Sequence, residues 1–328
     1  MDFVTLDAAD FVYGEADEVL PGVTRVVANN PSKFTYHGTG TYVIGDRDVA
    51  VVDPGPMLDS HRDALAAVLA GRTVRAILVT HCHADHSPLA SWLHAETGAP
   101  RYAYGPHGAA TADWDIGALP DDFGRPTDQA PDADEVGEPK VEESTDTAFA
   151  PDVEVRSGDE VFADGSVLIV ALHTPGHTSN HSCFAMRSSD GRHTLFTGDH
   201  VMGWSTTVVS PPDGDMAAYI DSLRMVAGRR DHVAIPTHGA PIDRPGRYIG
   251  QLVDQRLERE RQVLDAVRRG RTTIPEMVPD LYADVRVELH RPAGASVLGH
   301  LVKRVADGNV AIDGEWDHPR LDARDRAV

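Results

Sequence analysis

The chain has 328 residues, which is long enough to bury a large hydrophobic core, and we expect one large α/β domain followed by a small one. Hydrophobic residues make up 41% of it and charged residues 25%, which is ordinary for a globular protein and argues against a disordered chain. The formal net charge of −21 disfavours general binding to nucleic acid, because negative charge repels phosphates at long range.

Cysteine content and hydropathy indicate a soluble cytoplasmic protein. The two cysteines, Cys82 and Cys183, lack the short paired spacing of a disulfide-rich secreted domain. Residues 1–10 contain three aspartates and no basic residue, unlike the basic start of a secretory signal. No window approaches the roughly 20 uninterrupted apolar residues of a membrane span, so we expect no membrane partner.

Short β-rich runs alternate with turn residues in the first third of the chain. They predict strands at 23–28, 41–45 and 49–53. Apolar residues at helical spacing predict a helix that Asp59 caps and that ends at residue 70. The nearly continuous apolar run 74–80 predicts a buried strand that leads directly into a histidine-rich segment.

Residues 110–152 interrupt this alternation. They show little periodicity and contain several prolines, and the stretch 113–160 holds 16 acidic and 3 basic residues. We therefore expect residues 110–152 to form a surface insertion rather than a domain, with regular structure resuming at Val153.

The alternation of strands and helices returns after this insertion. Residues 215–227 predict a helix with Asp215 at its start. The β-rich runs predict strands at 161–162, 167–172, 181–186, 194–197 and 233–236. The strands and helices up to this point form the predicted large domain, residues 1–243.

The pattern changes in the predicted second domain, residues 244–328. Apolar residues at helical spacing predict a long amphipathic helix at 248–269, a second helix beginning near Thr273 and a third at 295–305. Three helices followed by the β-rich residues 309–312 predict a small, mostly helical, winged-helix-like domain. Residues 244–304 hold 12 basic and 8 acidic residues, so this end of the protein could meet an anionic partner.

A cluster of metal-binding residue types follows the predicted strand 74–80. Residues 81–86 read His-Cys-His-Ala-Asp-His, which places four potential ligands within six residues. A loop with this spacing after a buried strand can close around two metal ions. Three further candidate ligands follow later predicted strands: His177, Asp199 and His238.

With these residues in this order, the chain resembles the metallo-β-lactamase superfamily over about residues 20–242. The resemblance implies the α/β architecture of that family, an αββα sandwich. Two zinc ions are the expected cofactors, although iron or manganese also accepts imidazole and carboxylate ligands. The resemblance implies one metal ion on His81, His83 and His177, a second on Asp85, His86 and His238, and Asp199 as the bridge between them.

The chemistry that this resemblance implies is hydrolysis by a hydroxide that bridges the two metal ions. Asp85 is the expected catalytic residue, because a ligand at this position can also orient the nucleophile and transfer a proton. Asp53 matches an aspartate that supports the metal-binding loop in the family. A covalent mechanism on Cys82 is disfavoured, because alternation within the motif points its side chain away from the metal ions.

The tail resembles that of the β-lactamase-like protein 2 group, through Arg259-Glu260-Arg261, Leu281-Tyr282 and His300-Leu301. That group includes a single-strand endoribonuclease and is related to glyoxalase II-like thioesterases. Three functions therefore stay open: a hydrolase of a small ester, thioester or lactone, which we favour, a single-strand endoribonuclease, and a di-iron redox protein. The expected partner is a small-molecule substrate rather than a nucleic acid, and the oligomeric state is open, with a homodimer as one option.

Overall fold

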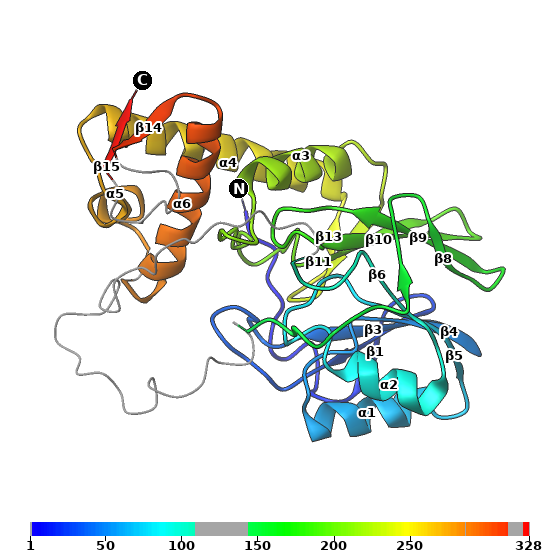
Figure 1. Cartoon of the computed structure of the whole chain (residues 1–328). Coiled ribbons are helices and arrows are strands. Elements are labelled where there is room, and N and C mark those ends of the chain that lie inside the picture. Colours follow the sequence, from blue (N-terminus) through cyan, green and yellow to red (C-terminus); the bar gives the residue numbers. More distant parts are fainter. Residues whose placement is uncertain (1, 109–143, 286, 314–323, 328) are drawn as a thin grey trace.

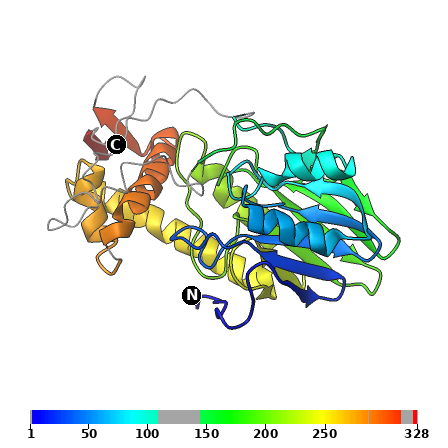
Figure 2. The ribbon, with the colours of Figure 1, turned by 90° about the horizontal axis from the view of Figure 1, so that it is seen from below.

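A computed structural model describes residues 2–108, 144–285, 287–313 and 324–327. Two β-sheets form the middle of the large domain, with α1 and α2 on one outer face and α3 and α4 on the other (Figure 1). The remaining helices extend to one side of this sandwich (Figure 2). The structure thus confirms the predicted αββα sandwich followed by a smaller, mostly helical domain.

The first sheet contains seven strands in chain order. The first four pair in antiparallel fashion, and the last four are parallel to one another. Helices α1 (Asp59–Leu69) and α2 (Leu89–Thr97) connect parallel strands and cover the outer face. The strands are β1 (Ala16–Leu20), β2 (Val23–Val27), β3 (Gly40–Gly45), β4 (Asp48–Val52), β5 (Thr73–Leu78), β6 (Arg101–Ala103) and β7 (Val153–Glu154).

Several details of this half differ from the sequence expectation, and strands β1, β6 and β7 were not predicted. Asp59 is the first residue of α1 and not its cap, because its carboxylate pairs with Arg62 one turn later while Leu58 takes the extended cap conformation. Helix α2 was not predicted from the sequence. It buries Leu89 and Leu93 and ends at Gly98, which has a left-handed backbone conformation. Its pattern is too short to give more than a weak periodic signal.

The second sheet has the strand order β13-β12-β11-β10-β9-β8. Helix α3 (Met216–Ala227) connects the parallel strands β11 and β12 and confirms the predicted helix. Asp215, expected as its first residue, is its cap, and its carboxylate accepts from the amides of Ala217 and Ala218. The short β13 was not expected. The strands are β8 (Glu160–Ala163), β9 (Val167–His173), β10 (Ser182–Ser188), β11 (His193–Gly198), β12 (Val233–Pro236) and β13 (Ile242–Asp243).

The core between the sheets follows from the two-residue period of the strands. In β3, Tyr42 and Ile44 face the second sheet, whereas Val43 faces the helices on the outer side. Both faces of β3 and β4 are therefore buried, which explains why these strands read as continuous apolar runs.

Part of the acidic segment is packed against the sandwich. The expectation of a surface insertion falls mostly on residues 109–143, which lie outside the described residues. From Ser144 onward the chain is placed: Phe149 is 2% exposed in the outer core, and Asp146 donates its amide to the carbonyl oxygen of Cys82 and accepts from the Ser87 hydroxyl. Residues 144–152 therefore close over the loop that follows β5, and the next strand, β7, begins at Val153 as expected.

The C-terminal part begins with a helix that belongs to two cores. The first half of α4 (Pro245–Arg268) packs on the sandwich through residues such as Ile249 and Leu252, and its second half packs on the later helices through residues such as Val263. The boundary at residue 243 remains a prediction. The later elements are α5 (Ile274–Leu281), a 3-10 turn (Val287–Leu289), α6 (His290–Ala306), β14 (Val310–Asp313) and β15 (Arg324–Ala327).

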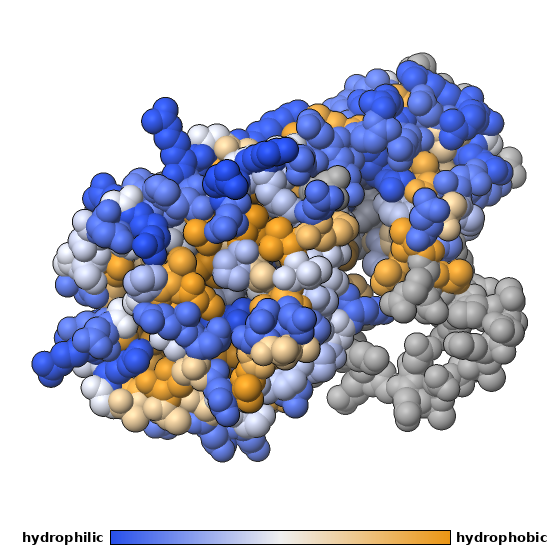
Figure 3. Space-filling view, turned by 180° about the vertical axis from the view of Figure 1, so that it is seen from behind, coloured by the Kyte–Doolittle hydropathy of each residue, from blue (hydrophilic) through white to orange (hydrophobic). Residues whose placement is uncertain are grey.

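The surface seen from behind is mainly hydrophilic, with several separate hydrophobic patches (Figure 3). The antiparallel ribbon of β14 and β15 follows the three C-terminal helices, as a winged-helix arrangement requires.

None of the helices in the described part of the chain combines the length and apolarity needed to cross a bilayer.

Candidate metal centre

The seven predicted ligands all lie in loops at one edge of the sandwich. Strands β9, β11 and β12 point in the same direction, because β10 is antiparallel to β9 and β11, while β11 and β12 are parallel. His177, Asp199 and His238 follow the carboxyl ends of these three strands. The loop 81–86 follows β5 in the facing sheet, so the topology brings together segments that are far apart in sequence.

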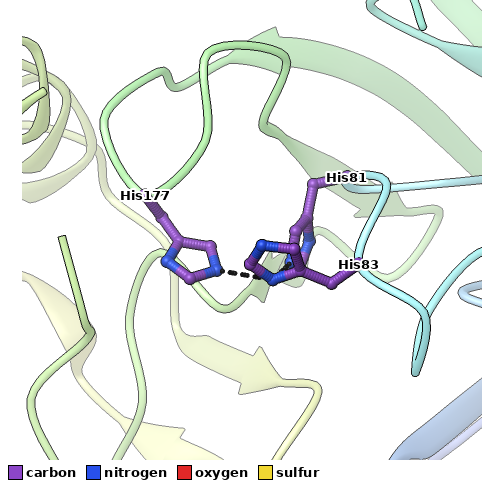
Figure 4. Close-up of side chains that lie close together, drawn as sticks. All are labelled: His81, His83 and His177. Atoms are coloured by element: carbon purple, nitrogen blue, oxygen red, sulfur yellow. Dashed lines mark hydrogen bonds between the residues drawn. The ribbon is translucent and has the colours of Figure 1, made fainter. Parts of the chain in front are cut away.

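His81, His83 and His177 form the first group, and their rings point toward one another (Figure 4). Nδ1 of His83 lies 2.9 Å from Nε2 of His81 and 3.2 Å from Nε2 of His177. Two nitrogens bound at about 2.0–2.1 Å to one tetrahedral zinc ion lie about 3.3 Å apart, which is close to this spacing. The three nitrogens thus have the arrangement of ligands to a single ion.

Asp85, His86 and His238 form the second group. Oδ2 of Asp85 lies 3.2 Å from Nε2 of His86 and 3.1 Å from Nε2 of His238. All three side chains are buried, so this group is largely shielded from water. A buried carboxylate between two imidazoles offers one oxygen and two nitrogen ligands to a divalent cation.

Asp199 lies between the two groups. Its Oδ1 is 3.3 Å from Nε2 of His238 and 3.6 Å from Nε2 of His86, and its Oδ2 is 3.9 Å from Nε2 of His177. One carboxylate therefore directs one oxygen to each group. This is the position that the resemblance implied for a bridging ligand.

The other ring nitrogen of each of four histidines is occupied. Nδ1 of His177 donates to the carbonyl oxygen of Val208 at 2.7 Å, and Nδ1 of His238 donates to the carbonyl oxygen of Gly38 at 3.1 Å. Nδ1 of His81 and of His86 have the Thr80 hydroxyl and the Asp53 carboxylate as partners. These contacts hold each ring in orientation and, with a proton on Nδ1, leave Nε2 as the atom that a bound cation would take.

Asp53 supports the centre from the end of β4. Its Oδ1 accepts from the amide of Thr80, and its Oδ2 accepts from the hydroxyls of Thr80 and Thr237 and from Nδ1 of His86. The residue is fully buried and has a positive φ of 47°. A backbone conformation that is rare outside glycine is kept here because four hydrogen bonds hold the carboxylate in place.

The pKa shifts show how the two groups differ in charge. Burial lowers the pKa of His81 well below its usual value and that of His83 to about 3, so both rings are neutral lone-pair donors. Burial also opposes protonation of His238, but the carboxylates of Asp199 and Asp85 outweigh it and raise its pKa to about 10. The carboxylate side of the centre thus attracts positive charge, as a cation site does.

The residues present fit a divalent cation. Two buried atoms that face the centre, Nε2 of His86 and Oδ1 of Asp199, have no hydrogen-bond partner among the described residues. Leaving such atoms unsatisfied is costly, and a cation between them would supply a ligand bond to both. Nitrogen and carboxylate ligands suit zinc, iron and manganese, so the donor set does not identify the metal.

Two residues near the motif behave differently from the ligands. Cys82 belongs to neither group of ligands, as alternation predicted: its Sγ accepts from the Asn180 amide, and burial raises its pKa to about 12. Thr39 was not singled out from the sequence, yet its hydroxyl donates to Oδ2 of Asp85 at 3.1 Å and accepts from Asn30 at 3.0 Å. A short polar residue in a loop gives no sequence signal for such a contact.

Comparisons with known proteins agree with this geometry. Residues 37–238 match the family described as the Metallo-beta-lactamase superfamily, and residues 273–317 match the Beta-lactamase associated winged helix domain. An atrochrysone carboxyl ACP thioesterase of Aspergillus chevalieri is 30% identical over 317 residues, covering 91% of this chain and 86% of the relative. A protein with the same name from Passalora fulva is 26% identical and covers 91% and 80%.

Solved structures share the fold along nearly the whole chain. A beta-lactamase domain protein from Burkholderia ambifaria superposes with a TM-score of 0.71 at 21% identity, covering 99% of this chain and 97% of that one. A metallo-beta-lactamase family protein from Thermus thermophilus gives a TM-score of 0.67 at 23% identity, covering 95% and 100%. The chain belongs to the metallo-β-lactamase superfamily and is a hydrolase of that fold, with the winged-helix domain associated with that family at its C-terminal end.

Proposed function

We propose that this protein is a metal-dependent thioesterase that hydrolyses an acyl thioester to a carboxylic acid and a thiol at a two-metal centre. The observation that carries the proposal is the position of Asp199, which directs one carboxylate oxygen to each of two ligand groups. Two ligand groups that share one carboxylate have the arrangement needed to bind a pair of neighbouring metal ions.

In this proposal His81, His83 and His177 hold one ion, Asp85, His86 and His238 hold the other, and Asp199 bridges them. Divalent ions bound there would polarise the thioester carbonyl and lower the pKa of water. We assign to Asp85 the second role of accepting a proton, because the Thr39 hydroxyl fixes the orientation of its Oδ2. Zinc is the proposed metal, on the ligand types alone.

The choice of a thioester rests on the relatives and on the leaving group. Several relatives of this chain bear the name ACP thioesterase, and the alignments span most of the chain. A thiol has a pKa of roughly 8.5, so a thiolate can leave without a strong proton donor. This substrate class is therefore compatible with a centre whose side chains are mainly metal ligands and proton acceptors.

Four arginines of the C-terminal domain already have partners within that domain, which weakens their support for the ribonuclease alternative. Arg261, Arg268 and Arg271 form ion pairs with acidic residues of α4 and α5, and Arg259 donates to the carbonyl oxygen of Leu281. Phosphate binding needs basic side chains that are free to replace counterions. A small thioester substrate needs no such basic path.

The test is a substrate and metal assay on the purified full chain. We expect about two divalent ions per chain by elemental analysis, and faster hydrolysis of acyl-N-acetylcysteamine thioesters than of the matching oxygen esters, a lactone and single-stranded RNA. The variants His83→Ala and Asp199→Asn should fall to the uncatalysed rate. The control His94→Ala removes a histidine of α2 that lies outside the seven ligands and should keep its activity.

Other outcomes would refute the proposal. A fully metal-loaded protein that cleaves RNA and no thioester would favour the endoribonuclease. Two iron ions with reversible oxygen reduction would favour the di-iron redox protein. Inactivity toward every ester, thioester and lactone tested would exclude the hydrolytic centre as proposed here.

A further inference from the structure

One arginine of the long C-terminal helix reaches the loop that carries a metal ligand. Arg256, in the middle of α4, is 5% exposed. Its Nη2 donates to the carbonyl oxygen of Thr207, and its Cζ lies 5.3 Å from the centre of the Tyr219 ring. Because α4 runs from α3 to the later helices (Figure 1), this contact links the C-terminal domain to the sandwich.

Thr207 belongs to a segment that holds two of the proposed ligands. Its hydroxyl donates to the carbonyl oxygen of Asp199 at 2.6 Å. The next residue, Val208, accepts the Nδ1 proton of His177 at 2.7 Å. A shift of Thr207 would therefore move the backbone of Asp199 and the acceptor that orients the His177 ring.

The burial of Arg256 calls for an explanation. In the described part of the chain no carboxylate forms an ion pair with it; its partners are a backbone carbonyl and the face of an aromatic ring. Removing a charge from water without an ionic partner is costly, and an apolar side chain would fill the same space at less cost. What the charged side chain contributes, and an apolar one would not, is the hydrogen bond to the carbonyl oxygen of Thr207.

The helix that carries Arg256 is itself anchored to the C-terminal domain. Glu260, one turn further along α4 and 2% exposed, pairs with Arg304 at 2.8 Å and with Lys303 at 3.3 Å, both on α6. Helix α6 also reaches the supporting segment, because a Cβ on Gly299 would lie 3.2 Å from the carbonyl oxygen of Val209. Two C-terminal helices that are tied together thus contact residues 207–209.

We propose that Arg256 is a positioning residue through which the C-terminal domain holds the segment 199–209, and with it Asp199 and His177, in metal-binding geometry. The inference rests on the proposed metal centre and deepens it, since it gives the C-terminal domain a role in building the site. Arg256 touches neither metal nor substrate, and its effect passes through the backbone of Thr207.

The test compares two arginines of the same helix. Arg256→Met removes the charge and the bond to Thr207 while keeping a long side chain. The matched control is Arg259→Met, because Arg259 also donates to a carbonyl oxygen, that of Leu281, and lies over an aromatic ring, that of Tyr282. Its contacts lie within the C-terminal helices and do not touch residues 199–209.

Metal binding is the primary measurement, made with Zn²⁺ against a chromophoric chelator and with Co²⁺, whose visible absorption reports the coordination geometry. We expect Arg256→Met to weaken metal binding by about 10- to 100-fold, as loss of a residue behind a metal ligand does, and to change the Co²⁺ spectrum. Arg259→Met should leave both unchanged. Arg256→Lys, which keeps a donor and the charge, should restore part of the affinity and the spectrum.

A double-substitution cycle tests the route through Thr207. Thr207→Val removes the bond to Asp199, so combining it with Arg256→Met should weaken metal binding by less than the product of the two single effects. Equal metal affinity and equal Co²⁺ spectra for the two Arg→Met variants would overturn the inference. If Arg256→Met does not fold, Arg256→Lys becomes the test variant, and the inference then requires that it bind metal more weakly than the parent protein.

This experiment separates the inference from the proposed function. Metal affinity and the Co²⁺ spectrum are measured without a substrate, so they test Arg256 even if no thioester is hydrolysed. If Zn²⁺ and Co²⁺ fail to bind the parent protein, the proposed centre and this inference both fall. If they bind but thioesters are not cleaved, only the choice of substrate falls.

Discussion

The carboxylate of Asp53 accepts a hydrogen bond from Nδ1 of His86 at 2.9 Å, although 33 residues separate them in sequence. Both side chains are fully excluded from solvent. The same Oδ2 atom also accepts from the hydroxyls of Thr80 and Thr237, which lie next to His81 and His238. One carboxylate therefore organises two separate segments that carry the proposed ligands, the loop after β5 and the end of β12.

The variant Asp53→Asn should weaken metal binding by about 10- to 100-fold, because an amide at this position accepts fewer bonds and no longer fixes the His86 ring. Competition with a chromophoric chelator measures this affinity. Asp48→Asn is the matched control, because Asp48 is a partly exposed aspartate at the start of β4, the strand that ends next to Asp53, and it pairs with Arg75. Unchanged metal affinity in Asp53→Asn would show that the supporting role is wrong.

Thr39→Val should lower kcat by about tenfold or more with little change in KM, which corresponds to about 1.4 kcal/mol in the barrier. The substitution keeps the shape of the side chain but removes its bond to Asp85, so one of the contacts that orient the carboxylate is lost. Steady-state kinetics on a thioester that the parent hydrolyses would measure the effect. Thr39→Ser should recover most of the activity, and a kcat equal to that of the parent in Thr39→Val would contradict the role given to Asp85.

Cys82→Ala should leave turnover within about twofold of the parent and lower the free energy of unfolding by about 1 kcal/mol. Burial raises the pKa of the thiol to about 12, so at neutral pH it is protonated and is not a nucleophile. Kinetics and urea denaturation measure the two quantities. Complete loss of turnover in a variant that still binds metal would revive the covalent mechanism.

Stability should fall as the pH drops from 7 to 4, in part because of His61. Its Nε2 donates to the Thr41 hydroxyl, whose own proton goes to the carbonyl oxygen of Asp53, and burial lowers the pKa of the ring to about 4. The unfolded chain takes up this proton near pH 6.5 and the folded chain only near pH 4. The contribution of the neutral ring is therefore complete above about pH 6.5 and is lost by about pH 4, on the order of 3 kcal/mol.

The variant His61→Gln isolates this contribution, because glutamine does not titrate in this range and keeps an N–H donor. Urea denaturation of both proteins at several pH values between about 4 and 7 should show a smaller loss of stability in the variant. The difference between the two curves should grow as the pH falls. Parallel curves would mean that the ring is already protonated in the folded state at neutral pH or exposed to solvent.

The sequence by itself predicted the strands β2 to β5 and β8 to β12, because each is a run of β-rich residues bounded by turn residues, but it did not predict β1 or the short strands β6, β7 and β13. It also predicted the three C-terminal helices, whose apolar residues recur at helical spacing. All seven predicted ligands come together in the structure. Four of them belong to the local pattern of residues 81–86 after a buried strand, whereas His177, Asp199 and His238 are brought to it by the topology of the second sheet. The sequence also predicted that Asp53 supports the metal-binding loop and that the side chain of Cys82 points away from the ligands, and the structure shows both.

Apart from Asp53, only the tertiary structure decided which residues support these ligands. Thr39, Val208 and Arg256 contact the centre or its supports through bonds between segments distant in sequence, and no periodicity or spacing encodes such contacts. The packing of residues 144–152 over the loop after β5, and the sharing of α4 between two cores, arise in the same way. Local patterns determine elements and ligand types, whereas the orientation of each ligand depends on hydrogen bonds that exist only once the two sheets and the C-terminal helices have packed together.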